Sequence, residues 1–146
     1  MSFEEKIRVT FAGQRLLALM GAQLVRVAAG EVDIALPFRE DLGQQSGSLH
    51  AGTIAAIADT ACGLASLTLM DPASDVVSVE FKLNLLAPAI GSRFLARGRV
   101  VRAGRNITFC QGEVLADDEK VVATITATMM QRRSQAAGRG SHEGRS

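Results

Sequence analysis

The hydrophobic positions of the first fifty residues predict one helical segment followed by two short strands. Apolar side chains within residues 3–20 recur at roughly helical spacing, and Gly21 is a candidate end for that helix. Residues 23–28 and 31–38 resemble two strands, and the second run alternates clearly between apolar and polar side chains. Residues 39–49 are polar and contain glycine, which is typical of a loop.

The longest apolar stretch, residues 51–69, predicts a single helix that the rest of the fold must bury. Its side chains are apolar almost all round, and Asp71-Pro72 marks its end. Four alternating runs follow, over residues 76–86, 93–102, 107–115 and 121–130. Their connections are too short for crossover helices, so the sheet is predicted to be antiparallel, with Asp117-Asp118 as a hairpin turn.

The order of these elements predicts an α+β domain in which an antiparallel sheet wraps around one long central helix. We expect residues 1–131 to form this single domain, with residues 1–20 as a helical segment at its start. Residues 132–146 are rich in Gly, Ser and Arg and are expected to be a disordered tail. The helix has more apolar circumference than a small sheet can cover, which predicts contact with another copy of the chain.

Composition narrows the class of protein. The 146 residues are 47% hydrophobic and carry a net charge of +1, which supports a real core and argues against nucleic-acid binding. Two cysteines without a CxxC motif fit a reducing cytoplasm, and the polar start does not resemble a signal peptide. Residues 51–70 are long enough to span a bilayer, but Asp59 near their middle disfavours a membrane segment.

Asp59 is the most unusual residue of the predicted central helix. It is the only charged residue between His50 and Asp71, and small or apolar residues surround it at helical spacing. A carboxylate in such a setting is costly unless it is paired or used. One interpretation is a structural hydrogen bond to a neighbouring segment. The other is a general base or nucleophile whose pKa is raised by burial.

The start of the same helix offers a second candidate site. Small residues at Ala51 and Gly52 leave room for a ligand at the free backbone N–H groups, which favour developing negative charge. The alternatives are an oxyanion site for a thioester carbonyl and an ordinary helix cap. Ala51 and Asp59 are about 12 Å apart along one helix. Two copies with antiparallel helices could bring them together, so the site is predicted to lie between subunits.

The remaining candidates are weaker. His50 and His142 are the only histidines, so no metal-ligand cluster is expected; His50 could cap the helix or act in catalysis. Cys62 fits packing better than nucleophilic attack. Arginines gather on the last hairpins and fit either a solvated strand face or a docking surface for coenzyme A phosphates; they are Arg93, Arg97, Arg99, Arg102 and Arg105. Gly104 indicates a tight turn there.

The run from Gln44 to Gly52, followed by Asp59, resembles the signature of hotdog-fold acyl-CoA thioesterases of the phenylacetic acid degradation (PaaI) type. That signature is an Asn or Gln, then a Gly, then His-Gly-Gly, and later Asp or Glu on the helix. Residues 77–81, whose alternation puts Ser78 on the face opposite Phe81, are similar with Pro88 to the family's third strand. The resemblance covers about residues 15–130.

The resemblance implies a hotdog fold, an acyl-CoA substrate, no separate cofactor, and a homodimer or a dimer of dimers. It makes Asp59 the catalytic carboxylate, activating water or attacking the thioester. The other implied catalytic residues are Ala51 and Gly52 through their N–H groups, Gln44 as an orienting amide, His50 as loop support, and Ser78 as a water ligand. The candidate substrate-binding residues are Thr60, Arg102, Gly104 and Arg105. Ala51 stands where the family usually has Gly, and Gln44 replaces the commoner Asn.

We therefore expect a thioesterase acting on medium-chain or aryl-acyl coenzyme A. Small residues of the helix could leave a slot for the acyl group, namely Ala55, Ala58, Ala61 and Gly63 with Leu64. A hotdog hydratase is the first alternative, but such enzymes tend to place Asp before His at the helix start, the reverse of the order here. The second alternative is a non-catalytic acyl-CoA binding module.

Overall fold

The computed structural model describes residues 1–133 and confirms the predicted hotdog architecture. The helices are α1 (Phe3–Ala12), α2 (Arg15–Met20) and α3 (Ala51–Leu67), with a 3-10 turn, η1, at Glu40–Leu42. The strands are β1 (Gln23–Ala28), β2 (Glu31–Pro37), β3 (Ser74–Leu85), β4 (Arg93–Ala103), β5 (Ile107–Ala116) and β6 (Lys120–Arg133). No helix among these residues is both long and apolar enough to cross a membrane.

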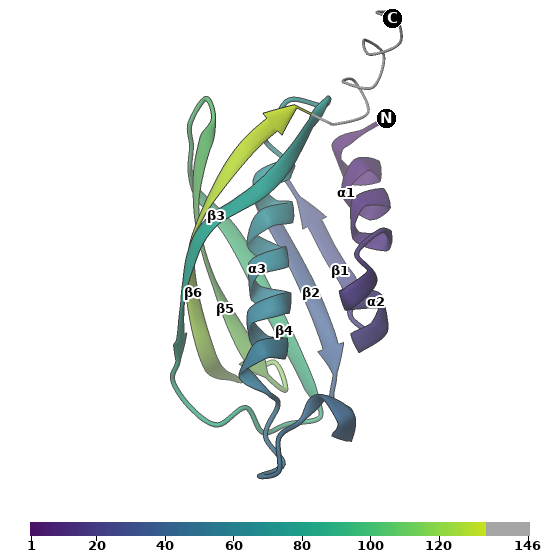
Figure 1. Cartoon of the computed structure of the whole chain (residues 1–146), viewed down its shortest axis with the longest axis vertical. Coiled ribbons are helices and arrows are strands. Elements are labelled where there is room, and N and C mark those ends of the chain that lie inside the picture. The colour runs from purple at the N-terminus through teal and green to yellow at the C-terminus, as the bar shows by residue number, and fades with distance from the viewer. Residues whose placement is uncertain (134–146) are drawn as a thin grey trace, which may run out of the picture.

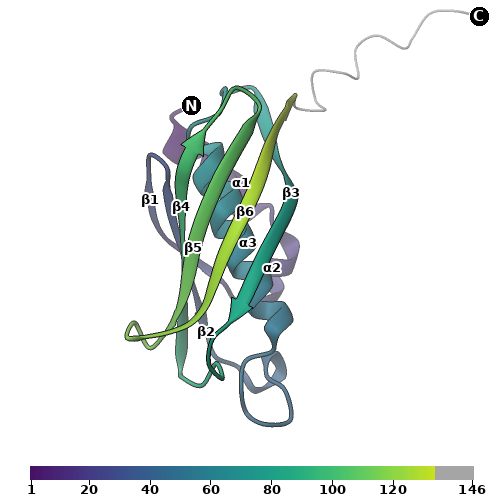
Figure 2. The same ribbon diagram turned by 90° about the vertical axis from the view of Figure 1, so that its left-hand side faces the viewer.

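All six strands form one antiparallel sheet in the order β1-β2-β4-β5-β6-β3. Helix α3 lies against one face of this sheet, and α1 and α2 lie beside it near β1 (Figure 1). The other face of the sheet carries no helix (Figure 2). Asp117 and Asp118, both with positive φ, lie in the predicted β5–β6 turn, which a hydrogen bond of 3.1 Å from the Glu119 N–H to Ala116 O closes.

Helix α3 sits unusually close to β4 because Gly98 lies beneath it. Ala61, Cys62 and Ala65 are fully buried where the helix meets the sheet. A Cβ atom on Gly98 would lie 2.5 Å from the carbonyl carbon of Ala61 and 2.7 Å from the amide nitrogen of Cys62. Only glycine therefore permits this approach, and Gly98 thereby sets the distance between α3 and β4.

Several element boundaries differ from the predicted ones; β3, for example, begins at Ser74 and not at residue 76. The first helix breaks at Gly13 and Gln14 into two helices, because the chain turns there to follow the core, whereas Gly21 ends α2 with a positive φ as predicted. Helix α3 ends two residues earlier than predicted, at Leu67; Thr68 is its C-cap, and the Thr68 hydroxyl donates to the Ala65 carbonyl. Strand β6 continues to Arg133 by pairing with β3, so the predicted tail cannot start at residue 132; residues 134–146 lie outside the described residues.

A β-bulge changes the predicted faces of β3. Its register with β6 shifts between Ser78 and Glu80, so Val79 is an extra residue. Ser78 pairs with Met129 and Phe81 with Ala127, and both of these partners are fully buried on the helix side of the sheet. Ser78 therefore shares the inner face with Phe81, contrary to the prediction that the two lie on opposite faces.

The N-terminal helix is tied to the connection between α3 and β3. The Lys6 Nζ donates to the carbonyl oxygens of Pro72 at 2.7 Å and Ser74 at 2.6 Å, and more weakly to that of Asp71 at 3.4 Å. Burial lowers the pKa of Lys6, against the opposing effect of nearby carboxylates. Ile7, next to it on α1, is fully buried. This anchoring ties α1 to the start of β3, and Thr10 near the end of α1 lines the same cleft as Ser78.

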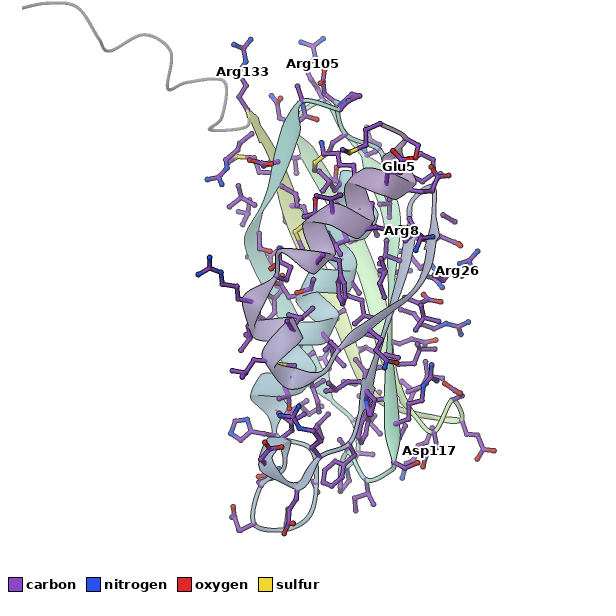
Figure 3. The ribbon with its side chains drawn as sticks, turned by 90° about the vertical axis from the view of Figure 1, so that its right-hand side faces the viewer. Glu5, Arg8, Arg26, Arg105, Asp117 and Arg133 are labelled. Atoms are coloured by element: carbon purple, nitrogen blue, oxygen red, sulfur yellow. The ribbon has the colours of Figure 1, made fainter. Side chains whose placement is uncertain are left out.

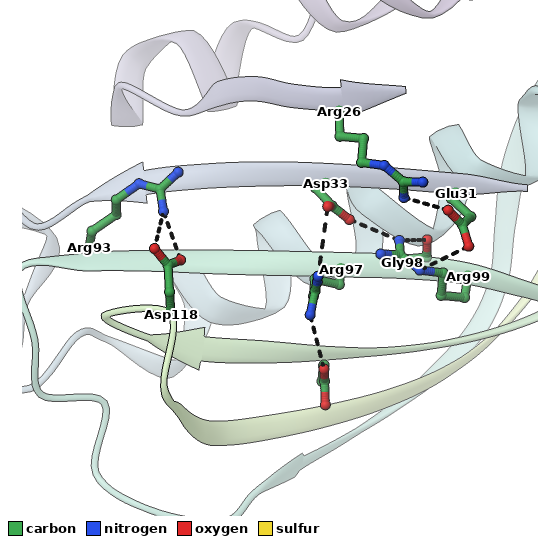
Figure 4. A network of polar contacts seen from close by, with 9 residues as sticks. Arg26, Glu31, Asp33, Arg93, Arg97, Gly98, Arg99 and Asp118 are labelled. Carbon is green, nitrogen blue, oxygen red and sulfur yellow. Dashed lines mark hydrogen bonds and ion pairs between the residues drawn. The ribbon is translucent and has the colours of Figure 1, made fainter. Parts of the chain in front are cut away.

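The helix-free face of the sheet carries an ion-pair network around Asp33 (Figure 4). Asp33 is only 4% exposed, and its carboxylate accepts from Arg99 Nη1 at 2.8 Å and lies 4.0 Å from Arg97 Nε. Glu31 contacts Arg99 and forms a second pair with Arg26. Arg97 and Arg99 are thus committed to carboxylates of this sheet, which supports a structural role for the arginines on this face.

Candidate active site

Asp59 and Ser78 form the chemical centre of the structure. Asp59 is half-buried on the middle of α3, and its Oδ1 accepts a hydrogen bond of 2.7 Å from the Ser78 hydroxyl. The bulge at Val79 is what turns Ser78 toward the helix. Burial raises the pKa of Asp59, and the hydrogen bond from Ser78 opposes that rise. The result is a carboxylate with increased basicity, held by one donor.

A cleft of about 310 Å³ opens beside this pair. Three segments far apart in the sequence line it: the break between α1 and α2, the second half of α3, and the start of β3 with its partner β6. Its lining residues are Thr10, Gln14, Asp59, Thr60, Gly63, Leu64, Leu67, Asp75, Val76, Ser78 and Arg132. The size is typical of a small-molecule site, and Asp59 is its central acidic group.

At the start of α3, the backbone N–H of Gly52 makes a hydrogen bond and that of Ala51 does not. His50 is the N-cap, and its Nδ1 accepts from the Gly52 N–H at 2.8 Å. This bond removes Gly52 from the predicted pair of oxyanion donors and explains His50 as loop and cap support. The N–H of Ala51, the first helical residue, makes no hydrogen bond within residues 1–133. Ala51 is therefore the remaining candidate donor for an oxyanion.

Ala51 and Gln44 line a second cleft, separate from that of Asp59. This cleft of about 470 Å³ lies between the loop before α3 and the segment after β3, and its other lining residues include Ser48, Leu85 and Pro88. The structure therefore brings Gln44 to the helix start, as predicted, but does not bring either residue to Asp59. Within one chain, the cleft that holds the acid and the cleft that holds the candidate oxyanion donor are therefore separate.

The predicted substrate-binding residues divide into two groups. Thr60 lines the cleft beside Asp59. Arg102, Gly104 and Arg105 lie on the exposed β4–β5 hairpin, where the Gly104 N–H bonds to Ile107 O at 2.8 Å in the predicted tight turn. Arg105 projects from the same end of the molecule as Arg133 (Figure 3). Neither Arg102 nor Arg105 lines the cleft of Asp59 in a single chain.

The burial of individual side chains tests the predictions made for Cys62 and for the acyl slot. Cys62 is fully buried, and burial, with Cys110 and Asp59 nearby, raises the pKa of its thiol far above the usual range, so it is a packing residue. Of the predicted slot residues, Gly63 and Leu64 line the cleft, whereas Ala58 and Ala61 are buried in the core. Within residues 1–133, no three metal-ligating side chains gather.

Three further residues of the cleft had no recognisable signal in the sequence. Thr10 and Gln14 reach it because α1 and α2 fold back beside α3, and Arg132 because β6 is longer than predicted. Each position depends on contacts between distant segments.

This chain belongs to the thioesterase superfamily, whose family model matches residues 46–123, more than half of its length. The match includes α3 with Asp59 and the β3 segment with Ser78. The family and the fold together identify the protein as a thioester hydrolase.

Individual relatives agree with this assignment. A thioesterase family protein from Silicibacter pomeroyi has 38% sequence identity and a TM-score of 0.88, over 91% of this chain and all of that one. The medium/long-chain acyl-CoA thioesterase YigI of Salmonella typhimurium is 30% identical over 95 residues, 56% of this chain and 61% of that protein. The Escherichia coli PaaI protein has a TM-score of 0.81 at 15% identity, over 89% of this chain and 93% of that one, which is a likeness of fold alone.

Proposed function

We propose that this protein hydrolyses acyl-coenzyme A thioesters of medium-chain or aryl-acyl type to the free acid and coenzyme A. The observation that carries the proposal is Asp59, half-buried in a cleft and hydrogen-bonded by Ser78, in a member of the thioesterase superfamily. The relative YigI, named for medium- and long-chain acyl-CoA, supports the substrate class.

Asp59 acts in this proposal as a general base on water. Its raised pKa makes it a better proton acceptor than an exposed carboxylate. The Ser78 hydroxyl donates a hydrogen bond to the Asp59 carboxylate and also contacts the attacking water. The hydroxide formed attacks the carbonyl carbon, the oxyanion accepts hydrogen bonds, and collapse breaks the C–S bond. The proton taken up by Asp59 then neutralises the departing thiolate of coenzyme A.

The oxyanion donor in this proposal comes from a second copy of the chain. The free N–H of Ala51 lies about 12 Å along α3 from Asp59, which is too far for one carbonyl. A two-fold arrangement with antiparallel helices places Ala51 and Gln44 of one copy opposite Asp59 of the other.

The edge strand β3 supports such a pairing. Val79, Phe81 and Leu85 expose 55%, 43% and 54% of their surface at the free edge of the sheet. An exposed apolar edge strand is normally covered by another element or another chain. We therefore propose a homodimer or a dimer of dimers. The free thiols of Cys62 and Cys110 suit a reducing cytoplasm as its location.

The direct test is release of coenzyme A thiol from a panel of acyl-CoA substrates. Asp59→Asn keeps the shape and the hydrogen-bond acceptor but removes the base, and is expected to lower kcat by about 10²- to 10⁴-fold. Thr126→Val, which changes a residue on the helix-free face, serves as the control and should keep wild-type rates. Unchanged turnover in Asp59→Asn would remove Asp59 from the chemistry.

The shared site is tested by mixing two inactive variants. Ala51→Pro deletes only the N–H, since proline is well tolerated at the first helical position and His50 before it is already extended. Ala51→Gly, which retains the N–H, is its control. Co-refolded Ala51→Pro and Asp59→Asn chains should regain about a quarter of wild-type activity, because each hybrid pair holds one intact site. Inactive mixtures that still form hybrids would place the whole site within one chain.

A further inference from the structure

The cleft beside Asp59 continues past the carboxylate along the C-terminal half of α3. Beyond Asp59 its lining becomes apolar, with Gly63, Leu64 and Leu67 from α3 and Val76 from β3. It ends at Asp75 and Arg132, which face each other as register partners of β3 and β6. These apolar residues form one wall that begins beside the acid, while polar side chains, among them Thr10, Gln14 and Thr60, line the rest of the cleft. Such a wall suits an apolar group attached to the reacting carbonyl.

We propose that this stretch is the slot for the acyl chain and that Gly63 determines the size of acyl group it accepts. The inference rests on the proposed function, because it assumes a thioester reacting at Asp59. The pantetheine arm of coenzyme A is a poorer occupant. Its amides would lose hydrogen bonds to water against Leu64, Leu67 and Val76, whose side chains offer neither donors nor acceptors.

Gly63 is the smallest residue of the apolar wall. It lies four residues beyond Asp59, on the same face of α3. A Cβ atom at this position would find nothing nearer than Val76 Cγ1 and Met129 Sδ, both at 3.9 Å. The packing therefore does not require a glycine here, and glycine inside a helix is unfavourable. Its missing side chain leaves room for about one methyl group beside Val76 and Met129, in the cleft that also holds the acid.

The length of the slot indicates which acyl groups fit. Eight residues separate Asp59 from Leu67, which is roughly 12 Å along the helix axis. With carbon–carbon bonds of about 1.5 Å in a zigzag, an extended chain of about ten carbons covers that distance. Thr10 of α1 and Gln14, at the break between α1 and α2, line the outer side. The slot therefore selects linear acyl chains of medium length.

The selection should appear as a dependence of kcat/KM on chain length. Each methylene buried along the slot should raise kcat/KM by about fourfold, until the chain reaches Asp75 and Arg132. Longer chains gain nothing further, because their ends would contact charged groups or water. A side chain at position 63 should occupy part of the slot close to the acid, so kcat/KM should stop rising at a shorter acyl chain.

The experiment measures thiol release from butanoyl-, octanoyl-, decanoyl- and hexadecanoyl-CoA, and from phenylacetyl-CoA, with wild type, Gly63→Ala and Gly63→Val. We expect the decanoyl-to-butanoyl ratio of kcat/KM to fall modestly in Gly63→Ala and by about tenfold or more in Gly63→Val. Thr126→Val adds a branched apolar side chain outside the cleft and should keep the wild-type ratio. Thermal melting of each variant confirms that it is folded.

The outcomes separate this inference from the proposed function. An equal loss for every substrate in folded Gly63→Val would assign the slot to the coenzyme A arm and overturn the inference. An unchanged ratio, or a wild-type preference for phenylacetyl-CoA that Gly63→Val leaves intact, would also overturn it. In each of these cases Asp59-dependent hydrolysis still stands. Absence of any turnover by the wild type would instead refute the proposed function itself.

Discussion

Gly98→Ala is expected to destabilise the protein more than its single added methyl group suggests. The new Cβ would lie 2.5 Å from the Ala61 carbonyl carbon and 2.7 Å from the Cys62 nitrogen. Ordinary contacts of this kind need about 3.5 Å or more, so α3 must move away from β4 by about 1 Å. The obstacle is helix backbone, which no change of rotamer can remove. Overpacking of this kind costs about 1–3 kcal/mol.

Gly63→Ala is the matched comparison, because it adds the same atom on α3 itself, where the helix packs against Val76 of β3 and Met129 of β6. Its Cβ meets nothing nearer than 3.9 Å, and replacing a helical glycine by alanine is favourable by about 1 kcal/mol. The two variants therefore change the free energy of unfolding in opposite directions. At about 3 °C per kcal/mol for a domain of this size, Gly98→Ala should melt about 3–9 °C lower and Gly63→Ala about 3 °C higher.

The assay is thermal and urea unfolding of both variants at equal protein concentration. Gly98→Ala should also lose activity, because a displaced α3 carries Asp59 away from Ser78. If Gly98→Ala melts within 1 °C of the wild type, or if Gly63→Ala is the less stable of the two, the close seating of α3 on β4 does not control stability as argued.

Three further predictions concern the titratable groups of the site. Asp59→Asn should melt at a higher temperature than wild type at pH 7. Burial raises the folded-state pKa of Asp59, so ionisation of this group opposes folding. The difference in melting temperature should vanish below a pH of about 4, where both side chains are neutral. Ser78→Ala removes the hydrogen bond that lowers the pKa of Asp59, so the acidic limb of the kcat/KM profile should move to higher pH; a shift to lower pH would contradict this. Cys62 should resist thiol reagents in the folded protein and react after unfolding in urea, because its thiol is buried and protonated; rapid native labelling would refute its packing role.

Most of the fold could be predicted from hydrophobic periodicity. The apolar run of α3 and the alternation of the strands arise because these side chains must be buried, whichever element covers them. Both patterns can therefore be recognised in the sequence without knowing what packs against them. The break at Gly13 and Gln14 was missed because both halves of that segment are helical by pattern. The extension of β6 to Arg133 was missed because pairing with β3, and not apolar alternation, maintains it.

The candidate site was predictable in part. Asp59 is conspicuous because a charge in an apolar helix is expensive, and this holds in any fold. Ser78 came from a family resemblance, and its direct bond to Asp59 depends on a bulge of one residue that alternation cannot reveal. The commitment of the Gly52 N–H to His50 was equally hidden, since cap geometry depends on the rotamer of one side chain.

The placement of the acid and the open backbone donor in two different clefts also bears on how the enzyme responds to dilution. If each working centre takes one half from each of two chains, a lone chain has no turnover. Specific activity would then decline as the enzyme is diluted below the dissociation constant of the pair, by mass action. Substrate spanning both chains would hold them together, so the decline would be steeper in its absence. The concentration of acyl-CoA would thereby influence how much of the protein is paired, without a separate regulatory site.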